Sequence, residues 1–198
     1  MPRRVDPDQR RAQIVDAYLR IVARSGVAAA TSRVLADEAG IAAGALWHYF
    51  GGFDEVVRAA FERVYRESDA RIQAALEGRR GLDAVRAMIR EIVPHDAQTR
   101  NEATVVVSFW GLLPAHEEFR ELTRGVERAW GEGMARHLDE AVADGDLDAA
   151  TPVRGLADAV LAVCEALQLR QVQASPLARA PRREEMLAQL LAGWRRAP

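Results

Sequence analysis

The side chains that could catalyse a reaction or bind a metal are few and scattered in this sequence. His116-Glu117 begins like the zinc-protease motif His-Glu-x-x-His, but position 120 holds Arg where the second histidine ligand is required. The single cysteine, Cys164, cannot form an internal disulfide, and no Cys/His cluster has the spacing of a zinc site. No nucleophile elbow, phosphate-binding loop or dinucleotide fingerprint occurs. We therefore expect no metal, no cofactor and no enzymatic activity.

The charge pattern does not predict a uniformly basic nucleic-acid binder. The chain of 198 residues has a formal net charge of −2, and arginine supplies every permanent side-chain cation because lysine is absent. Four of the eight arginines in the first 60 residues lie within the first eleven, so any attraction to DNA must come from a local face. No window approaches 18 uncharged apolar residues, and no apolar stretch follows the charged N-terminus. We expect a cytoplasmic protein with no membrane segment.

Helical periodicity dominates the chain, and the alternation typical of strands is nearly absent. Asp6 and Pro7 suit an N-cap and a first helical position, Gln9 suits a capping-box partner, and Gly26 suits a helix stop. The elements that must position any functional residue are predicted as helices over approximately 7–25, 31–39, 43–49, 52–77, 82–93, 101–113, 116–142, 151–174 and a last helix after Pro181.

Two of these predicted helices, 31–39 and 43–49, are short and are joined by a tight turn at Gly40. Thr31 can cap the first of them, whose Val34, Leu35 and Ala39 are expected to face inward. Two short helices at this spacing match the layout of a helix-turn-helix, whose second helix enters a DNA major groove.

The residues of this segment also resemble a known family. The sequence TSRVLADEAGIAAGALWHYFGGFDEVV is similar to the tetracycline-repressor (TetR) family pattern, and the resemblance covers residues 10–57. The matching positions are Thr31, Ala36, Ala39, Gly40, Ile41, Gly44, Leu46, Tyr49, Phe50, Asp54 and Glu55. The resemblance implies an all-α fold, with an N-terminal three-helix helix-turn-helix DNA-binding domain over 1–57. A helical ligand-binding and dimerisation domain is expected over 58–198.

The resemblance also implies a function. It predicts a homodimer that binds a palindromic double-stranded DNA operator and, as a repressor, is released from it by a small-molecule effector. Activation instead of repression stays open, because only the position of the operator distinguishes the two. A second alternative is a helical small-molecule-binding protein or enzyme in which the DNA-binding module is a relic.

Family resemblance assigns the residues expected to contact DNA. Small residues would let the third helix approach the bases closely, and an alanine methyl can contact thymine. The expected DNA-binding set is Arg3, Arg4, Thr31, Arg33, Ala43, Gly44, Ala45, Trp47, His48 and Tyr49. The alternatives are core packing for Trp47 and Tyr49, a solvated side chain for His48 and a disordered tail for the N-terminal arginines.

Two residues depart from the family pattern. Ala42 occupies the position of the usual serine and cannot cap the third helix with its side chain. Phe53 occupies the position of the usual lysine, which meets a phosphate. We therefore expect weaker DNA binding with a flatter salt dependence, because each phosphate contact contributes to counterion release. Arginines that could offset this loss are Arg3, Arg4, Arg10, Arg11 and Arg33.

An effector pocket is expected among the middle helices, with mainly apolar walls. The candidate ligand-binding residues are Met88, Phe109, Trp110, Trp130, Met134 and Glu165. The alternative is that the apolar members, Trp110 above all, are core. Glu165 is the one acid in the apolar stretch AVLAVCEALQLRQ, so it either faces a cationic ligand or forms a paired charge at the dimer rim. This stretch resembles the betaine- and choline-responsive branch of the family.

The last two long helices each carry an apolar stripe. Pairing of both stripes across a two-fold axis would make a four-helix dimer interface. The expected interface residues are Val160, Leu167, Leu187, Leu190, Leu191 and Trp194. The alternative is that both stripes belong to the core of one protomer.

Overall fold

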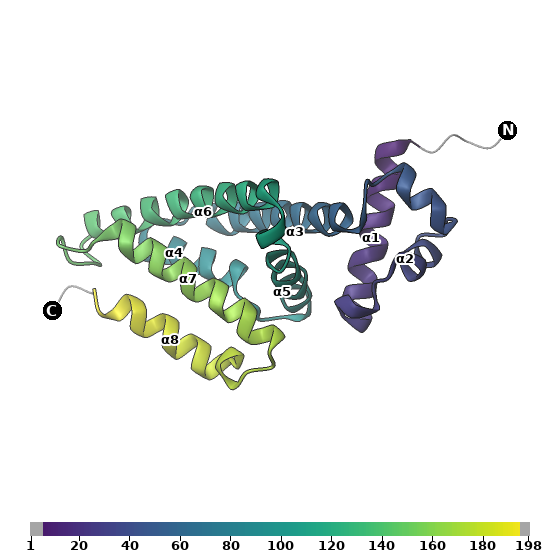
Figure 1. Cartoon of the computed structure of the whole chain (residues 1–198). Helices are drawn as coiled ribbons and strands as arrows, with labels where there is room; N and C mark the ends of the chain where they lie inside the picture. The colour runs from purple at the N-terminus through teal and green to yellow at the C-terminus, as the bar shows by residue number, and fades with distance from the viewer. Residues whose placement is uncertain (1–5, 195–198) are drawn as a thin grey trace.

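The computed structural model describes residues 6–194, and the regular elements in that range are all helices (Figure 1). In chain order they are α1 (Pro7–Ser25), η1 (Val27–Ala29), α2 (Ser32–Glu38), η2 (Ala43–His48), α3 (Phe53–Leu76), α4 (Gly81–Ile92), α5 (Ala97–Trp110), η3 (Leu113–Ala115), α6 (Glu117–Ala143), α7 (Val153–Val172), η4 (Pro176–Ala178) and α8 (Ala180–Ala192). The predicted all-α fold is confirmed.

The ends of the first helices follow from their local sequence. Thr31 Oγ1 accepts a hydrogen bond from the Val34 backbone N–H at 3.3 Å and caps α2, as expected. Gly26 and Gly40 have φ values of +77° and +65°, which L side chains rarely adopt, so these two turns require glycine. The predicted capping box with Gln9 does not form, because Asp6 Oδ1 accepts from the backbone of Asp8 instead, at 3.1 Å.

Two elements differ from their prediction in extent or type. The predicted third helix is a 3-10 helix, η2, and its N-cap residue Ala42 makes no side-chain capping bond. Helix α5 begins at Ala97 rather than near 101, because Asp96 and Thr99 form a reciprocal capping box there. Sequence periodicity did not show this earlier start, because the added turn is polar.

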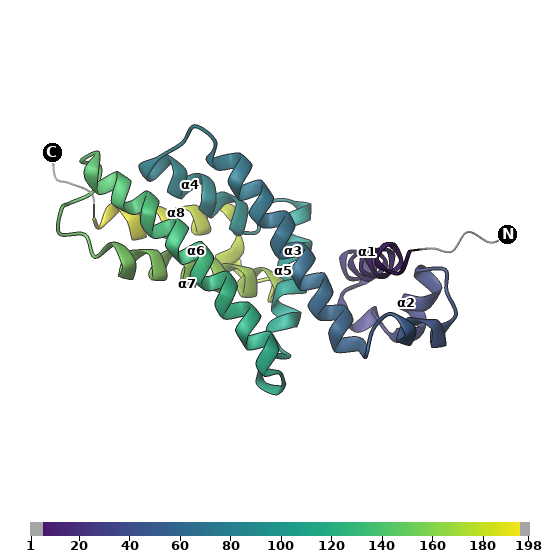
Figure 2. The ribbon, with the colours of Figure 1, turned by 90° about the horizontal axis from the view of Figure 1, so that it is seen from above.

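Helix α3 links the two parts of the molecule. Figures 1 and 2 show α1 and α2 at one end, with α3 running from that unit into the bundle of α4, α5, α6, α7 and α8. The predicted domain boundary at 57/58 falls within the first turns of α3. Motion of α3 therefore moves both units.

Two apolar cores stabilise these parts. The first core joins α1, α2, η2 and the start of α3 to the C-terminal end of α5 and the N-terminal end of α6. Its rings stack in a row, with centroids 4.0 Å apart for Phe61 and Phe109 and 5.1 Å apart for Phe109 and Phe119. The second core lies among α3, α4, α6, α7 and α8. The helix-turn-helix unit thus packs directly on helices of the larger bundle.

The burial of several side chains differs from its prediction. Leu35 is buried as expected, but Val34 is 39% exposed and Ala39 is only half-buried, because Ala36 takes the inward position on α2. In the predicted dimer stripe, Val160, Leu167 and Leu191 are buried within the single chain. Leu187 and Leu190 are half-buried against the same core, and Trp194 is exposed. The stripe is therefore mainly core of one protomer.

Candidate DNA interface and ligand cavity

The segment η2 presents an exposed face of small and aromatic residues. Ala43, Gly44 and His48 are exposed, and Trp47 is 44% exposed. Leu46 between them is fully buried and fixes the segment to the first core. The core-packing alternative for Trp47 is therefore wrong, whereas its contact with DNA stays a prediction.

The other predicted DNA-binding residues lie around this face. Arg33, on α2, is exposed, and Thr31 is exposed while it caps the same helix. Ala45 and Tyr49 are half-buried, and Tyr49 packs against the first core. Arg3 and Arg4 lie outside the described residues.

Gly44 is not required by the fold. A Cβ atom added at this position would meet nothing within 4 Å, and the residue does not have a positive φ. The segment tolerates a side chain at this point, so the absence of one needs another explanation. Close approach of the backbone to a ligand is the usual alternative use of glycine.

Arg11 fastens η2 to the start of α3. Its guanidinium donates to the Tyr49 carbonyl, and also to Glu55 Oε1 at 2.8 Å. The same guanidinium lies 4.2 Å from the centre of the Phe50 ring. Glu55 Oε2 in turn accepts from the Gly51 backbone N–H at 2.6 Å. The hydrogen bonds from Arg11 and then Gly51 lower the pKa of Glu55. Arg11 is engaged within the chain, so it does not serve as the free phosphate contact considered from the sequence.

Phe53 packs inward at the position of the missing lysine. Its ring meets the ring of Tyr18 edge-on, with centroids 6.0 Å apart, and the side chain is half-buried. Tyr18 is fully buried, its hydroxyl has no hydrogen-bond partner among residues 6–194, and burial raises its pKa to about 12. Phe53 therefore contributes to the core that holds α1 against α3.

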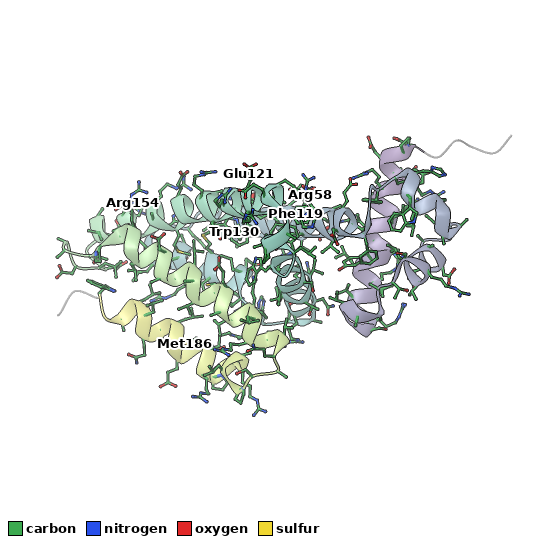
Figure 3. The ribbon with its side chains drawn as sticks, in the orientation of Figure 1. Arg58, Phe119, Glu121, Trp130, Arg154 and Met186 are labelled. Atoms are coloured by element: carbon green, nitrogen blue, oxygen red, sulfur yellow. The ribbon has the colours of Figure 1, made fainter. Side chains whose placement is uncertain are left out.

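A cavity of about 260 Å³ lies within the larger bundle, between α3, α5, α6 and α7. Its walls carry four aromatic side chains, Phe61, Tyr65, Trp110 and Trp130. Tyr65 and Trp130 lie together, with ring centroids 5.5 Å apart, and Trp130 Nε1 donates to Asp69 at 3.4 Å. Trp130 projects from α6 (Figure 3).

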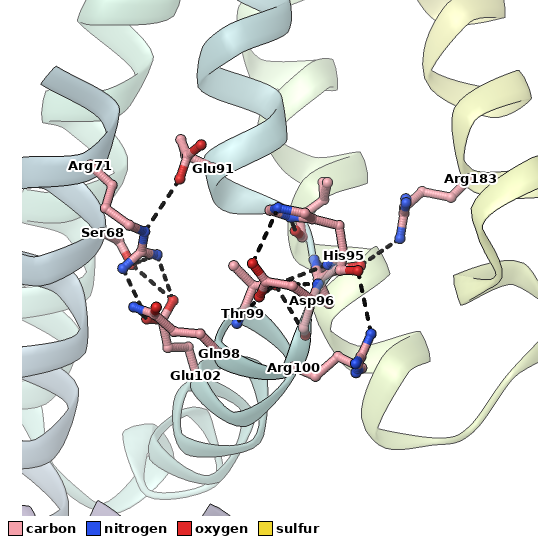
Figure 4. A network of polar contacts seen from close by, with 12 residues as sticks. Ser68, Arg71, Glu91, His95, Asp96, Gln98, Thr99, Arg100, Glu102 and Arg183 are labelled. Carbon is pink, nitrogen blue, oxygen red and sulfur yellow. Dashed lines mark hydrogen bonds and ion pairs between the residues drawn. The ribbon is translucent and has the colours of Figure 1, made fainter. Parts of the chain in front are cut away.

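Arg71 neutralises one end of this cavity. Its guanidinium binds both oxygens of Glu102, at 3.0 and 2.7 Å, and also reaches Glu91 at 3.3 Å, so it joins α3 to α5 and α4 (Figure 4). Ser68 donates to Glu102 at 3.4 Å. Glu102 and Ser68 both line the cavity, and their polar groups are used by the protein itself.

Three further acids line the cavity. Glu127, Asp158 and Glu165 line it, from α6 and α7, and no ion pair to any of them occurs within residues 6–194. Burial, and secondarily the charge of Glu127, raises the pKa of Glu165. The alternative that Glu165 forms a paired charge at the dimer rim stays a prediction, because it concerns the partner subunit. The carboxylate of Glu165 faces a cavity that holds other negative charge.

The sequence identified only part of this cavity. Trp110, Trp130 and Glu165 line it, whereas Met88, Phe109 and Met134 are buried in the two cores and do not. Phe61 and Tyr65 were missed, although their i,i+4 spacing on α3 places both on one helix face. Glu127 was missed as well, although it precedes Trp130 by three residues on α6.

Other reactive groups play no part in a site. Cys164 is fully buried, and desolvation raises the pKa of its thiol to about 12, which suppresses the nucleophilic thiolate. Within residues 6–194 no group of three or more His, Cys, Asp or Glu side chains could hold a metal ion. None of the helices described there is long and apolar enough to cross a bilayer.

The cavity and the helix-turn-helix unit are connected by more than α3. His116, the N-cap of α6, lies with Nε2 3.1 Å from Asp54 Oδ2 in the first turn of α3, and its ring stacks on Phe119 at 4.4 Å. Helix α6 also supplies Trp130 and Glu127 to the cavity. Helix α6 thus contacts both the cavity and the start of α3.

Comparisons with known proteins agree with this architecture. Residues 81–195 match the family described as BetI-type transcriptional repressor, C-terminal, and residues 14–60 match bacterial regulatory proteins of the tetR family. The HTH-type transcriptional regulator PksA of Bacillus subtilis is 34% identical over 110 residues, which is 55% of this chain and 54% of PksA. The HTH-type transcriptional regulator BetI of Brucella anthropi is 27% identical over 129 residues, 65% of each chain. The chain thus spans about half to two thirds of these curated relatives.

Solved structures share the fold over nearly the whole chain. A transcriptional regulator from Rhodococcus superposes with a TM-score of 0.79 at 21% identity, covering 95% of this chain and 99% of the other. A regulator from Saccharomonospora viridis in complex with choline gives a TM-score of 0.79 at 18% identity, covering 92% and 94%. A helix-turn-helix unit on an all-α bundle is the architecture of a bacterial transcriptional regulator. The chain belongs to the TetR family, since the BetI-type C-terminal family covers more than half of its length.

Proposed function

We propose that this protein is a homodimeric transcriptional repressor that a small organic cation releases from operator DNA. The observation that carries the proposal is the course of α3. Its first residues adjoin the exposed η2 face, and farther along it supplies Phe61, Tyr65 and Ser68 to the cavity. One continuous helix therefore joins the proposed DNA contact to the proposed effector site. Operator binding would place the protein in the cytoplasm.

The cavity chemistry favours a cation. Aromatic faces attract cations through the ring quadrupole, and the attraction strengthens where water is excluded. The unpaired carboxylates of Glu127, Asp158 and Glu165 add charge complementarity, while Arg71 already neutralises Glu102. The regulator from Saccharomonospora viridis is described as a complex with choline, an organic cation, which supports this class of effector.

Effector binding would act through α6. A cation between Glu127 on α6 and Glu165 on α7 would relieve their mutual repulsion and favour a bundle in which these helices lie differently. Because His116 at the start of α6 contacts Asp54 on α3, that change would tilt the helix-turn-helix unit. Two units tilted in a dimer no longer match half-sites about 34 Å apart.

The dimer would use the outward faces of α7 and α8. Within residues 6–194, the exposed large apolar side chains are Val34, Trp47, Leu169, Val172 and Trp194. Val34 and Trp47 lie on the helix-turn-helix unit, whereas Leu169 and Val172 lie on α7 and Trp194 follows α8. Leu169 and Val172 are three residues apart at the end of α7 and so share one face, whereas Trp194 lies at the other end of this helix pair, where its carbonyl accepts from the Asp148 N–H. Exposed apolar side chains of this size are typical of an interaction surface.

The test of the DNA-binding part is selection of bound sequences from a random duplex pool. A repressor dimer should recover a palindrome, and Gly44→Phe should lose binding to it while keeping its helicity and oligomeric state, because the fold leaves room for the new side chain. Gly125→Phe is the matched control for an added ring, because Gly125 lies on α6, outside the proposed DNA and dimer surfaces, and a Cβ atom there also meets nothing within 4 Å. Recovery of no common sequence, or unchanged affinity of Gly44→Phe, would contradict the proposal.

A further inference from the structure

A second hollow, separate from the aromatic cavity, lies where the α4–α5 connection meets the segment between α7 and α8. It has a volume of about 290 Å³ and a mainly polar lining. Three guanidinium side chains and one imidazole reach its wall: Arg100, Arg179, Arg183 and His95. Within the described chain, no carboxylate lines it.

Arg183 is the anchor of this hollow. It comes from the first turn of α8, and its residue is only 9% exposed. Its guanidinium donates to the Pro94 carbonyl, and the carboxylate of Glu184 lies 3.5 Å away but is 71% exposed. A buried guanidinium is stabilised chiefly by a close carboxylate or another anion. In this hollow the protein supplies the Pro94 carbonyl and, at 3.5 Å, the solvent-exposed carboxylate of Glu184.

The other donors are held toward the same point. Arg100, on α5, donates to the His95 carbonyl at 3.3 Å, so Arg100 and Arg183 approach adjacent residues from two helices (Figure 4). Asp96 is the nearest acid in this segment: its Oδ1 accepts from Thr99, its Oδ2 lies 3.4 Å from Nε2 of His95, and it does not line the hollow. Arg179 is the exposed N-cap of α8, where the helix dipole adds partial positive charge.

We propose that this hollow binds a small oxyanion, a carboxylate or a phosphate group, between Arg100, Arg179 and Arg183. Guanidinium groups bind both kinds of oxyanion through paired N–H donors. Within residues 6–194 the one carboxylate paired with these three arginines is the exposed Glu184, beside Arg183. A bound oxyanion would add counter-charge to all three and would brace α5 against α8. The site is separate from the proposed effector site, where the carboxylates expected to bind the cation lie on α6 and α7.

The test is titration of the full-length protein with inorganic phosphate or with succinate, followed by calorimetry at constant ionic strength set with sodium chloride. We expect saturable binding of at least one of the two, and the anion that binds identifies the oxyanion class. The double variant Arg100→Gln/Arg179→Gln should weaken it at least tenfold. Both side chains are exposed, so the variant should fold, and unchanged circular dichroism and melting without anion would verify this.

Arg182→Gln provides the matched control. Arg182 is an exposed arginine on the first turn of α8 that does not line the hollow. It is compared with the single variant Arg179→Gln, which removes one charge from the same end of α8 and should weaken anion binding. The affinity of Arg182→Gln for the anion should equal that of the wild type. Absence of saturable binding to the wild type, or equal loss in the double variant and the control, would overturn the proposal. Neither result would affect operator binding or its release by a cation, which test the proposed function separately.

Discussion

Replacing Phe53 with lysine separates stability from DNA affinity. The lysine restores the cation that the family pattern carries at this position, but the structure gives Phe53 a packing role against Tyr18. Loss of the edge-on ring pair and of the half-buried apolar surface, together with a cation placed at the positive N-terminal end of α3, should lower the free energy of unfolding by about 2–3 kcal/mol. In the same variant, two new phosphate contacts per dimer should steepen log affinity against log salt by up to about 2 units.

The assay for Phe53→Lys combines two measurements. Urea denaturation gives the free energy of unfolding, and fluorescence anisotropy with the selected operator gives affinity at several salt concentrations. Phe53→Leu is the control, because it keeps an apolar contact and adds no charge. An unchanged salt slope in a folded dimer would show that position 53 does not face the DNA backbone. Unchanged stability would show that the contact with Tyr18 is not stabilising.

Three further predictions follow from named contacts. Tyr18→Phe should leave stability unchanged or raise it by about 1 kcal/mol in urea denaturation, because the buried hydroxyl has no partner in the described part of the chain; a clear loss would mean that the hydroxyl is bonded. Leu169→Glu with Val172→Glu should yield monomers with much weaker operator binding in sedimentation and anisotropy, and a persisting dimer would place the interface elsewhere. The affinity for choline should be full above the raised pKa of Glu165 and fall as pH drops through it, since protonation removes the charge that attracts the cation. Glu165→Gln should remove most of that pH dependence in calorimetry, and an identical profile in the variant would exclude Glu165 as a ligand.

Helix positions and the helix-turn-helix could be predicted because they depend on local residues. The cap at Thr31 and the left-handed turns at Gly26 and Gly40 are each encoded within a few positions. Capping also explains one error, since the start of α5 depends on Asp96 and Thr99, outside the apolar pattern that defined the predicted helix.

The direction that a side chain faces was harder to predict from sequence. Apolar stripes on α7 and α8 fit an interface or a core equally well, and only the packing of α4 and α6 against them shows that Val160 and Leu191 are core. The same limit applies to the cavity, where Phe109 fills a core and Trp110 beside it lines the wall. Arg11 binds Tyr49 and Glu55, which lie 38 and 44 positions farther along the chain, and no local pattern indicates such distant contacts.

Release of the operator by a cation tests the central claim most directly. The preformed complex of wild-type protein with its selected operator would be titrated with choline and, in parallel, with its uncharged isostere 3,3-dimethylbutan-1-ol, and followed by fluorescence anisotropy. We predict that choline dissociates the complex, that the isostere does so at least tenfold less effectively, and that Glu165→Gln with Glu127→Gln abolishes the difference. Equal effects of the charged and uncharged compounds on the wild type, or a complex that neither compound dissociates, would contradict the account.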